Sequence, residues 1–122
     1  MTQITTAQLC SNDNDAFRSA FGTIARHALP FMAPDAYSTD LLHDAAQAAA
    51  LNEGERFYIL VRRLGTHVYG YPDDAIDYLS KTDGVAVLRV IRNRYDTFSV
   101  TVVHVDEMRS ALYGIKPVMI GV

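Results

Sequence analysis

The segment 85–106 constrains the fold of this chain more than any other stretch of the sequence. Residues 85–91 (VAVLRVI) and 98–105 (FSVTVVHV) are rich in β-branched side chains, and a short polar segment around Asp96 and Thr97 separates them. Two such runs joined by a short polar connection are typical of an antiparallel β-hairpin. We therefore expect residues 85–106 to form a hairpin within a larger sheet.

The length of the connection decides which side chains share a face of this hairpin. A loop of two residues, or of four, pairs Arg89 with His104 and Val87 with Asp106. In that register Arg89, His104 and Asp106 lie together at the base of one otherwise apolar face. A loop of three residues shifts the pairing by one and separates them, because side chains alternate between the two faces of a strand.

Two interpretations of this cluster compete. A histidine between an arginine and an aspartate can act as a general base or hold an anion, and His104 with Asp106 offers two metal ligands on one side of a strand. In the structural interpretation, Asp106 caps a following helix over Glu107 to Tyr113, Arg89 pairs with Asp106, and His104 is a hydrogen-bonded core residue. We favour the structural interpretation and expect no metal. Catalysis by His104, Arg89 and Asp106 is the alternative.

Two stretches that precede the hairpin have helical periodicity. In residues 13–28 apolar side chains recur every three or four positions, and Pro30 and Pro34 follow this stretch. The same spacing recurs in residues 40–51. The positions expected to face inward are Ala16, Phe17, Ala20, Phe21, Ile24 and Ala28 in the first helix, and Leu41, Leu42, Ala45, Ala46 and Ala49 in the second.

The remaining segments complete an α-α-β-β-α-β-β-α-β order. Residues 57–61 and 66–70 flank a plausible turn at Leu64 and Gly65, a short helix begins at Pro72, and residues 117–122 resemble a terminal strand. This order predicts one α+β domain over residues 1–122, with a helical layer (1–54) and a sheet-forming part (55–122). We expect a mainly antiparallel sheet of about five strands, formed by two hairpins and the C-terminal strand. Two N-terminal helices and two short helices pack on it.

Composition and missing motifs exclude several classes of function. A hydrophobic fraction of 49% and a charged fraction of 20% are typical of a globular domain, and a single cysteine excludes an internal disulfide and fits a reducing cytoplasm. We found no signal-peptide pattern, no apolar stretch of membrane-spanning length, no phosphate-binding loop and no zinc-ligand spacing. We therefore expect a cytoplasmic protein without a membrane segment or cofactor.

The distribution of charge argues against nucleic acid as the partner. Residues 1–55 carry seven acidic residues against two arginines, a balance of −5, whereas residues 56–122 have a balance of +2 within a net charge of −3. Proteins that bind nucleic acid typically carry a clustered basic face, and a charge balance of +2 is too small to indicate such a face.

A second candidate surface lies on the hairpin of residues 57–70. Alternation places five polar or aromatic residues on one face: Tyr58, Arg62, His67, Tyr69 and Tyr71. Tyrosine and arginine dominate protein-binding hot spots, so this face is a candidate binding surface. In the competing interpretation the N-terminal helices cover it, and the tyrosines are core residues whose hydroxyls reach the rim.

These observations favour a non-enzymatic protein that binds a protein partner, as inhibitors, immunity proteins and adaptors do. The basis is the segregated charge, the Tyr/Arg-bearing face and the lack of an assembled catalytic signature. The alternative is a small enzyme or ligand-binding domain that uses His104, Arg89 and Asp106. A homodimer, formed through an exposed strand such as residues 117–122, is compatible with either function.

Overall fold

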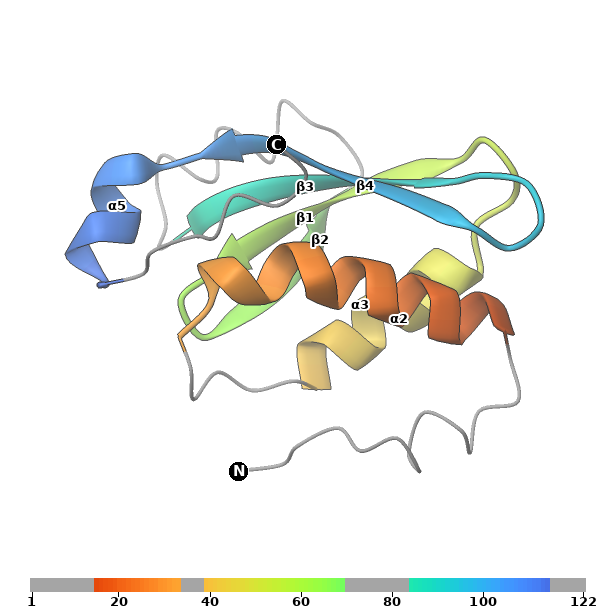
Figure 1. Ribbon diagram of the computed structural model, residues 1–122, viewed down its shortest axis with the longest axis horizontal. Coiled ribbons are helices and arrows are strands. Elements are labelled where there is room, and N and C mark those ends of the chain that lie inside the picture. The colour runs from red at the N-terminus through yellow and green to blue at the C-terminus, as the bar shows by residue number, and fades with distance from the viewer. Residues whose placement is uncertain (1–14, 34–38, 70–83, 115–122) are drawn as a thin grey trace.

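The computed structural model describes residues 15–33, 39–69 and 84–114 (Figure 1). Within these ranges the chain forms three α-helices and four β-strands, and a short 3-10 helix, η1, spans Leu29–Phe31. The helices are α2 (Asp15–Ala28), α3 (Thr39–Ala49) and α5 (Glu107–Leu112). The strands are β1 (Arg56–Arg62), β2 (Gly65–Tyr69), β3 (Gly84–Arg92) and β4 (Phe98–Val105).

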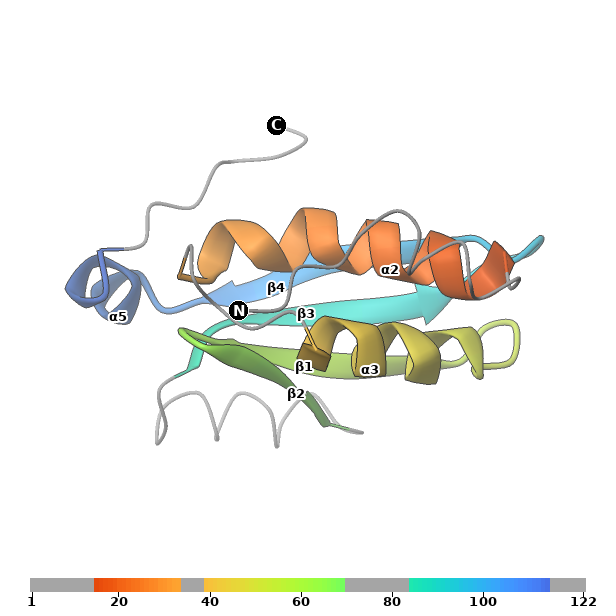
Figure 2. The ribbon, with the colours of Figure 1, turned by 90° about the horizontal axis from the view of Figure 1, so that it is seen from below.

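The four strands form one antiparallel sheet in the order β2-β1-β3-β4. Both predicted hairpins are present, and they join side by side through β1 and β3. Helices α2 and α3 pack on one face of this sheet (Figure 2). The α+β class and the antiparallel sheet are therefore confirmed. The described part has fewer strands and helices than predicted, and the expected helix from Pro72 and strand 117–122 lie outside the described residues.

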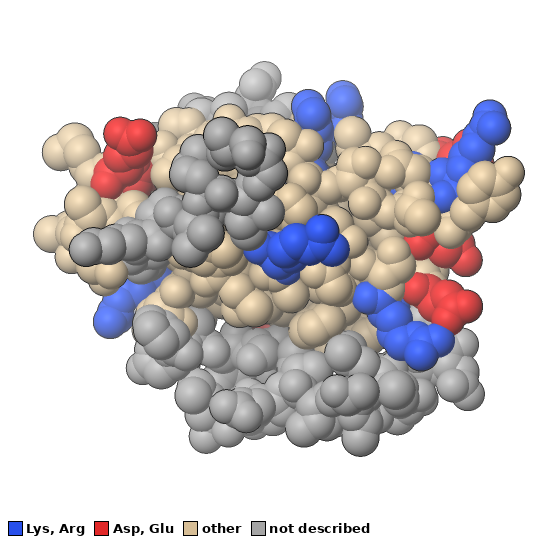
Figure 3. Space-filling view, in the orientation of Figure 1, with Lys and Arg blue, Asp and Glu red and all other residues tan. Residues whose placement is uncertain are grey.

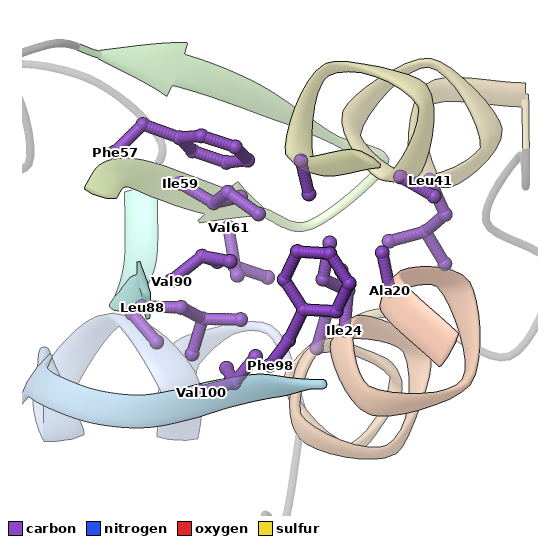
Figure 4. Close-up of a cluster of buried hydrophobic side chains, with 14 of the residues drawn as sticks. Ala20, Ile24, Leu41, Phe57, Ile59, Val61, Leu88, Val90, Phe98 and Val100 are labelled. Atoms are coloured by element: carbon purple, nitrogen blue, oxygen red, sulfur yellow. The ribbon is translucent and has the colours of Figure 1, made fainter. Parts of the chain in front are cut away.

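The core lies between the two helices and the sheet. In Figure 4, Ala20, Ile24 and Leu41 of the helices point toward apolar side chains of the strands. Those strand residues include Ile59, Val61, Leu88, Val90 and Val100. Burying one side chain of this size contributes roughly 1.5–3 kcal/mol relative to leaving it in water, so this shared core holds the helices on the sheet.

The buried stripe of α3 differs from the predicted one at Ala46 and Ala48, and it also includes Asp44. Leu41 and Ala45 are buried as expected, but Ala46 is exposed and Ala48 takes its place in the core. The difference follows from helical geometry, because Ala48 lies three residues after Ala45 on the same side of the helix.

The expected register of the β3–β4 hairpin is wrong. Arg92 pairs with Phe98, so the connection is the five-residue segment 93–97 rather than one of two or four residues. Two consecutive residues of this loop, Tyr95 and Asp96, have φ angles of 58° and 57°, in the left-handed region. A bulge opposite Val87 and Leu88 then shifts the pairing once more.

Arg92 explains why the loop begins where it does. Its Nη1 donates to the backbone oxygens of Ala49 at 3.0 Å and Leu51 at 2.5 Å, at the C-terminal end of α3, where carbonyls lack helical partners. Its Nη2 pairs with the carboxylate of Asp96 in the loop. Arg92 therefore fixes the start of the connection through contacts that are distant in sequence.

Candidate functional site

The predicted pairings of Arg89 with His104 and of Val87 with Asp106 do not form. Arg89 lies opposite Thr101, and His104 lies opposite Val87. Asp106 lies beyond the end of β4, where its carboxylate accepts a hydrogen bond from the backbone N–H of Arg109 at 2.8 Å as the N-cap of α5. Among the hydrogen bonds and ion pairs identified in the described residues, none joins two members of this cluster.

Asp106 has the structural role that the sequence indicated, but with a different arginine. Nη1 of Arg109 lies 3.7 Å from the Asp106 carboxylate and donates to the backbone oxygen of Gly84 at 3.0 Å. Arg109 therefore holds α5 against the start of β3, in the place expected for Arg89. His104 is exposed to solvent, which corrects the expectation of a core histidine.

The tyrosine-bearing face divides into buried and accessible residues. Helices α2 and α3 cover the opposite face of the sheet, so the expectation that they cover this one is wrong. Tyr58 is nevertheless only 5% exposed and forms a second buried cluster with Leu60 and Val87. Arg62 is half-buried and His67 is exposed. The side chain of Tyr69, and Tyr71 altogether, lie outside the described residues.

Of the members of that face whose side chains the structure describes, His67 is the exposed one and Tyr58 is buried. Tyr58, at 5% exposure, presents little surface to a partner. The binding role of Arg62 and His67 stays a prediction.

A buried joint between α3 and β2 was missed by sequence reasoning. The side chain of Asp44 is only 2% exposed and accepts a hydrogen bond from the hydroxyl of Thr66. One turn earlier on α3, the carboxylate of Asp40 accepts from the backbone N–H of Thr66 at 3.2 Å. Two carboxylates of one helix thus bind a single residue of the edge strand.

Burial dominates the electrostatics of this joint. It raises the pKa of Asp44 from 3.8 to about 6, because the charged carboxylate loses hydration. The Thr66 hydrogen bond and the charge of His43 lower the pKa, and the neighbouring charge of Asp40 raises it further. Asp44 therefore changes protonation near neutral pH inside a packed contact.

Gly65 leaves room for the Asp40 carboxylate where this helix approaches the strand. A Cβ atom at this position would overlap the carboxylate oxygen of Asp40 and lie 3.4 Å from Nη2 of Arg62. The sequence did contain a signal for the joint, because Asp44 lies three residues after Leu41 and immediately before Ala45, within the apolar stripe of the helix. An acid at such a position requires a buried partner.

A second feature missed from the sequence is the outer side of β4 with its two flanks. Among the residues that the structure describes, no strand pairs with the outer side of β4, and the strand itself (FSVTVVHV) carries no lysine, arginine, acid or proline. Large apolar side chains flank it and are strongly exposed: Tyr95 at 91%, Met108 at 85% and Leu112 at 81%. We call β4 together with Tyr95, Met108 and Leu112 the β4 surface.

The two flanks of the β4 surface lie far apart. Tyr95 belongs to the 93–97 loop that precedes β4, whereas Met108 and Leu112 belong to α5, which follows it. Figures 1 and 2 both place the loop and α5 at opposite ends of the strand. Figure 3 shows acidic and basic side chains next to each other at the loop end, where Arg94 pairs with Glu53 at 3.2 Å. The charges there are mutually compensated.

Comparisons with known proteins found no matching family model, no related curated protein and no similar solved structure. In ranges 15–33, 39–69 and 84–114, no group of three or more metal-binding side chains is close enough to hold an ion. The described helices include none with the length and apolar character needed to span a bilayer.

Proposed function

We propose that this chain is a non-enzymatic protein that acts by binding a protein chain through the β4 surface. The observation that carries the proposal is an uncharged edge strand whose two ends expose three large apolar side chains. Inhibitors, immunity proteins and adaptors act by such contacts, and we place the protein in the cytoplasm as the sequence predicts.

An edge strand of this kind is rarely left open. Its outward backbone N–H and C=O groups are a template for another strand, and proteins usually protect such edges with charged residues or proline. The eight-residue β4 has neither, although the bulge opposite Val87 and Leu88 interrupts its regular pairing. A partner that adds a strand to a sheet edge gains main-chain hydrogen bonds, and its side chains give specificity.

The exposed side chains supply the apolar contact that strand addition alone lacks. Aromatic residues and methionine are enriched in protein interfaces. Met108 and Leu112 lie four residues apart and therefore on the same side of α5. Burying both contributes roughly 3–6 kcal/mol before the cost of association.

The catalytic alternative has less support, because none of the hydrogen bonds and ion pairs identified in the described residues joins two of Arg89, His104 and Asp106. The polar joint at Asp44 is sealed in packing and holds the fold together.

Site-specific photo-crosslinking tests the proposed function. A benzophenone amino acid replaces Leu112 in one version of the full chain and the exposed Ala46 of α3 in a control. After irradiation in an extract of the source cells, we expect discrete crosslinked protein bands from position 112 and none from position 46. Equal labelling from both positions, or none from position 112, contradicts the proposal.

A charge substitution provides the matched functional test. The double variant Met108→Asp and Leu112→Asp should abolish crosslinking from a benzophenone placed at Tyr95. Its circular dichroism spectrum should match that of the wild type, because both side chains are exposed on the single chain and do not hold its fold together.

A further inference from the structure

We infer that the occupant of the β4 surface is a second copy of this chain, paired antiparallel through β4 about a two-fold axis near Thr101. This inference rests on the proposed use of the β4 surface and names the partner. Three features of the strand and its flanks carry it: the direction of the backbone groups, the side chains that face each other across the axis, and the positions of the exposed apolar residues.

The backbone pattern shows which residues can pair outward. The N–H of Asn93 donates to the oxygen of Thr97 at 2.8 Å, which fixes the start of the β3–β4 ladder. Hydrogen-bonded residues alternate along an antiparallel pair, so Ser99 and Thr101 direct their backbone groups toward β3. Val100 and Val102 direct theirs to the outer side of the sheet.

A two-fold axis at Thr101 matches these outward groups to each other. It places Val100 of one copy opposite Val102 of the other, on both sides of the axis, as hydrogen-bonded pairs. Thr101 then faces its own copy, and cross-strand threonine pairs contribute roughly 0.2–1 kcal/mol each. Because β4 carries no lysine, arginine or acid, no such charges are brought together along the strand.

The same axis brings together the apolar side chains that one copy leaves exposed. Tyr95 precedes Thr101 by six positions, and Met108 follows it by seven. Antiparallel pairing exchanges the two ends of β4, so the 93–97 loop of one copy lies beside α5 of the other. Tyr95 of each copy then meets Met108 and Leu112 of its partner. The β4 surface is therefore complementary to itself, which favours a second copy over an unrelated chain.

The helices are arranged so that this pairing extends both layers of the fold. Helix α2 packs against β3 and β4 (Figure 2). It lies on the face of the sheet that α3 also covers. The two-fold axis places two copies of α2 next to each other over a continuous sheet of eight strands. Among the strands that the structure describes, the edges that remain are the two copies of β2, which has five residues. Short edge strands are one of the ways in which proteins limit further association.

The mass of the full chain in solution is the first test. Size-exclusion chromatography with light scattering should give about 27 kDa, twice the 13.5 kDa of one chain. The variant Thr101→Lys places two like charges at the axis and should give 13.5 kDa. Ala46→Lys adds the same charge at an exposed position of α3 and should leave the mass at the dimer value.

If Thr101→Lys does not fold, disulfide formation between two copies tests the inference instead. In a background of Cys10→Ser, Thr101→Cys should form a disulfide-linked dimer on mild oxidation, because a non-hydrogen-bonded pair has Cα atoms about 4.5 Å apart, within disulfide range. Cys10→Ser with Ala46→Cys is the control and should stay unlinked.

Two results overturn the inference. One is a monomer at all protein concentrations together with no linkage through Thr101→Cys. The other is a dimer that persists in a folded Thr101→Lys variant and does not link through Thr101→Cys, since this places the contact elsewhere. In the first case, crosslinking from position 112 to a different protein leaves the proposed function in place.

Discussion

Replacing Asp44 with asparagine isolates the energetic effect of the buried carboxylate at the α3–β2 joint. The substitution preserves the size of the side chain, and the amide oxygen can still accept the hydrogen bond from Thr66. What it removes is the negative charge that burial disfavours. The difference in unfolding free energy between the two proteins therefore reports the ionisation of Asp44.

The magnitude follows from the shift in pKa. Burial raises the folded-state pKa of Asp44 from 3.8 to about 6, so the folded chain holds a proton that the unfolded chain has lost between these values. The stability that protonated Asp44 contributes is fully present below about pH 3.8 and is lost as the pH rises through about 6. At 1.36 kcal/mol for each pKa unit, the loss is about 3 kcal/mol.

Urea unfolding followed by circular dichroism, between about pH 3.5 and 7.5, tests this reasoning. We expect the stability of Asp44→Asn relative to the wild type to rise by about 3 kcal/mol over that range, with roughly half of the rise complete by pH 5. Glu107→Gln removes a carboxylate exposed on α5 and controls for the loss of one charge. A difference that is flat with pH, or that falls as pH rises, refutes the argument.

Two glycine substitutions have opposite expected effects on stability, both measurable as urea midpoints. Gly65→Ala should destabilise the chain by about 1–3 kcal/mol, because the added Cβ atom displaces the Asp40 carboxylate that holds Thr66. An unchanged urea midpoint would show that the Asp40 side chain moves aside without loss of stability. Gly22→Ala should stabilise it by about 0.5–1 kcal/mol, because the position is exposed in the middle of α2 and a Cβ atom there meets nothing within 4 Å. A loss of stability at Gly22 would contradict the helix-propensity argument.

The existence of both hairpins could be predicted because alternation and β-branched residues are local properties of the sequence. The register of the β3–β4 hairpin could not be predicted in this way. Its five-residue loop holds Tyr95 and Asp96 in left-handed conformations, which are usual for glycine and asparagine in hairpin turns rather than for tyrosine. The contacts that fix this loop come from Arg92, whose partners at Ala49 and Leu51 lie more than forty residues earlier.

The candidate sites likewise depend on contacts between residues that are distant in the sequence. Alternation correctly separated Phe57 and Ile59 from Tyr58, but it does not indicate which face of a sheet the helices cover. The joint at Asp44 depends on Thr66, a residue 22 positions away on another element. Its only local sign is an acid within an apolar stripe. Exposure of the β4 surface depends on strand order, which the sequence alone does not determine.

The contacts of Arg92 also determine how the molecule can open. Its backbone oxygen accepts from Gly54, its N–H donates to the oxygen of Glu55, and its side chain reaches the end of α3 and Asp96 in the loop. The helix end, the segment that leads into β1 and the hairpin loop are therefore held through one residue. Regions that share such links unfold together in native-state fluctuations. We therefore expect the loop, although it is at the tip of the hairpin, to open together with the end of α3.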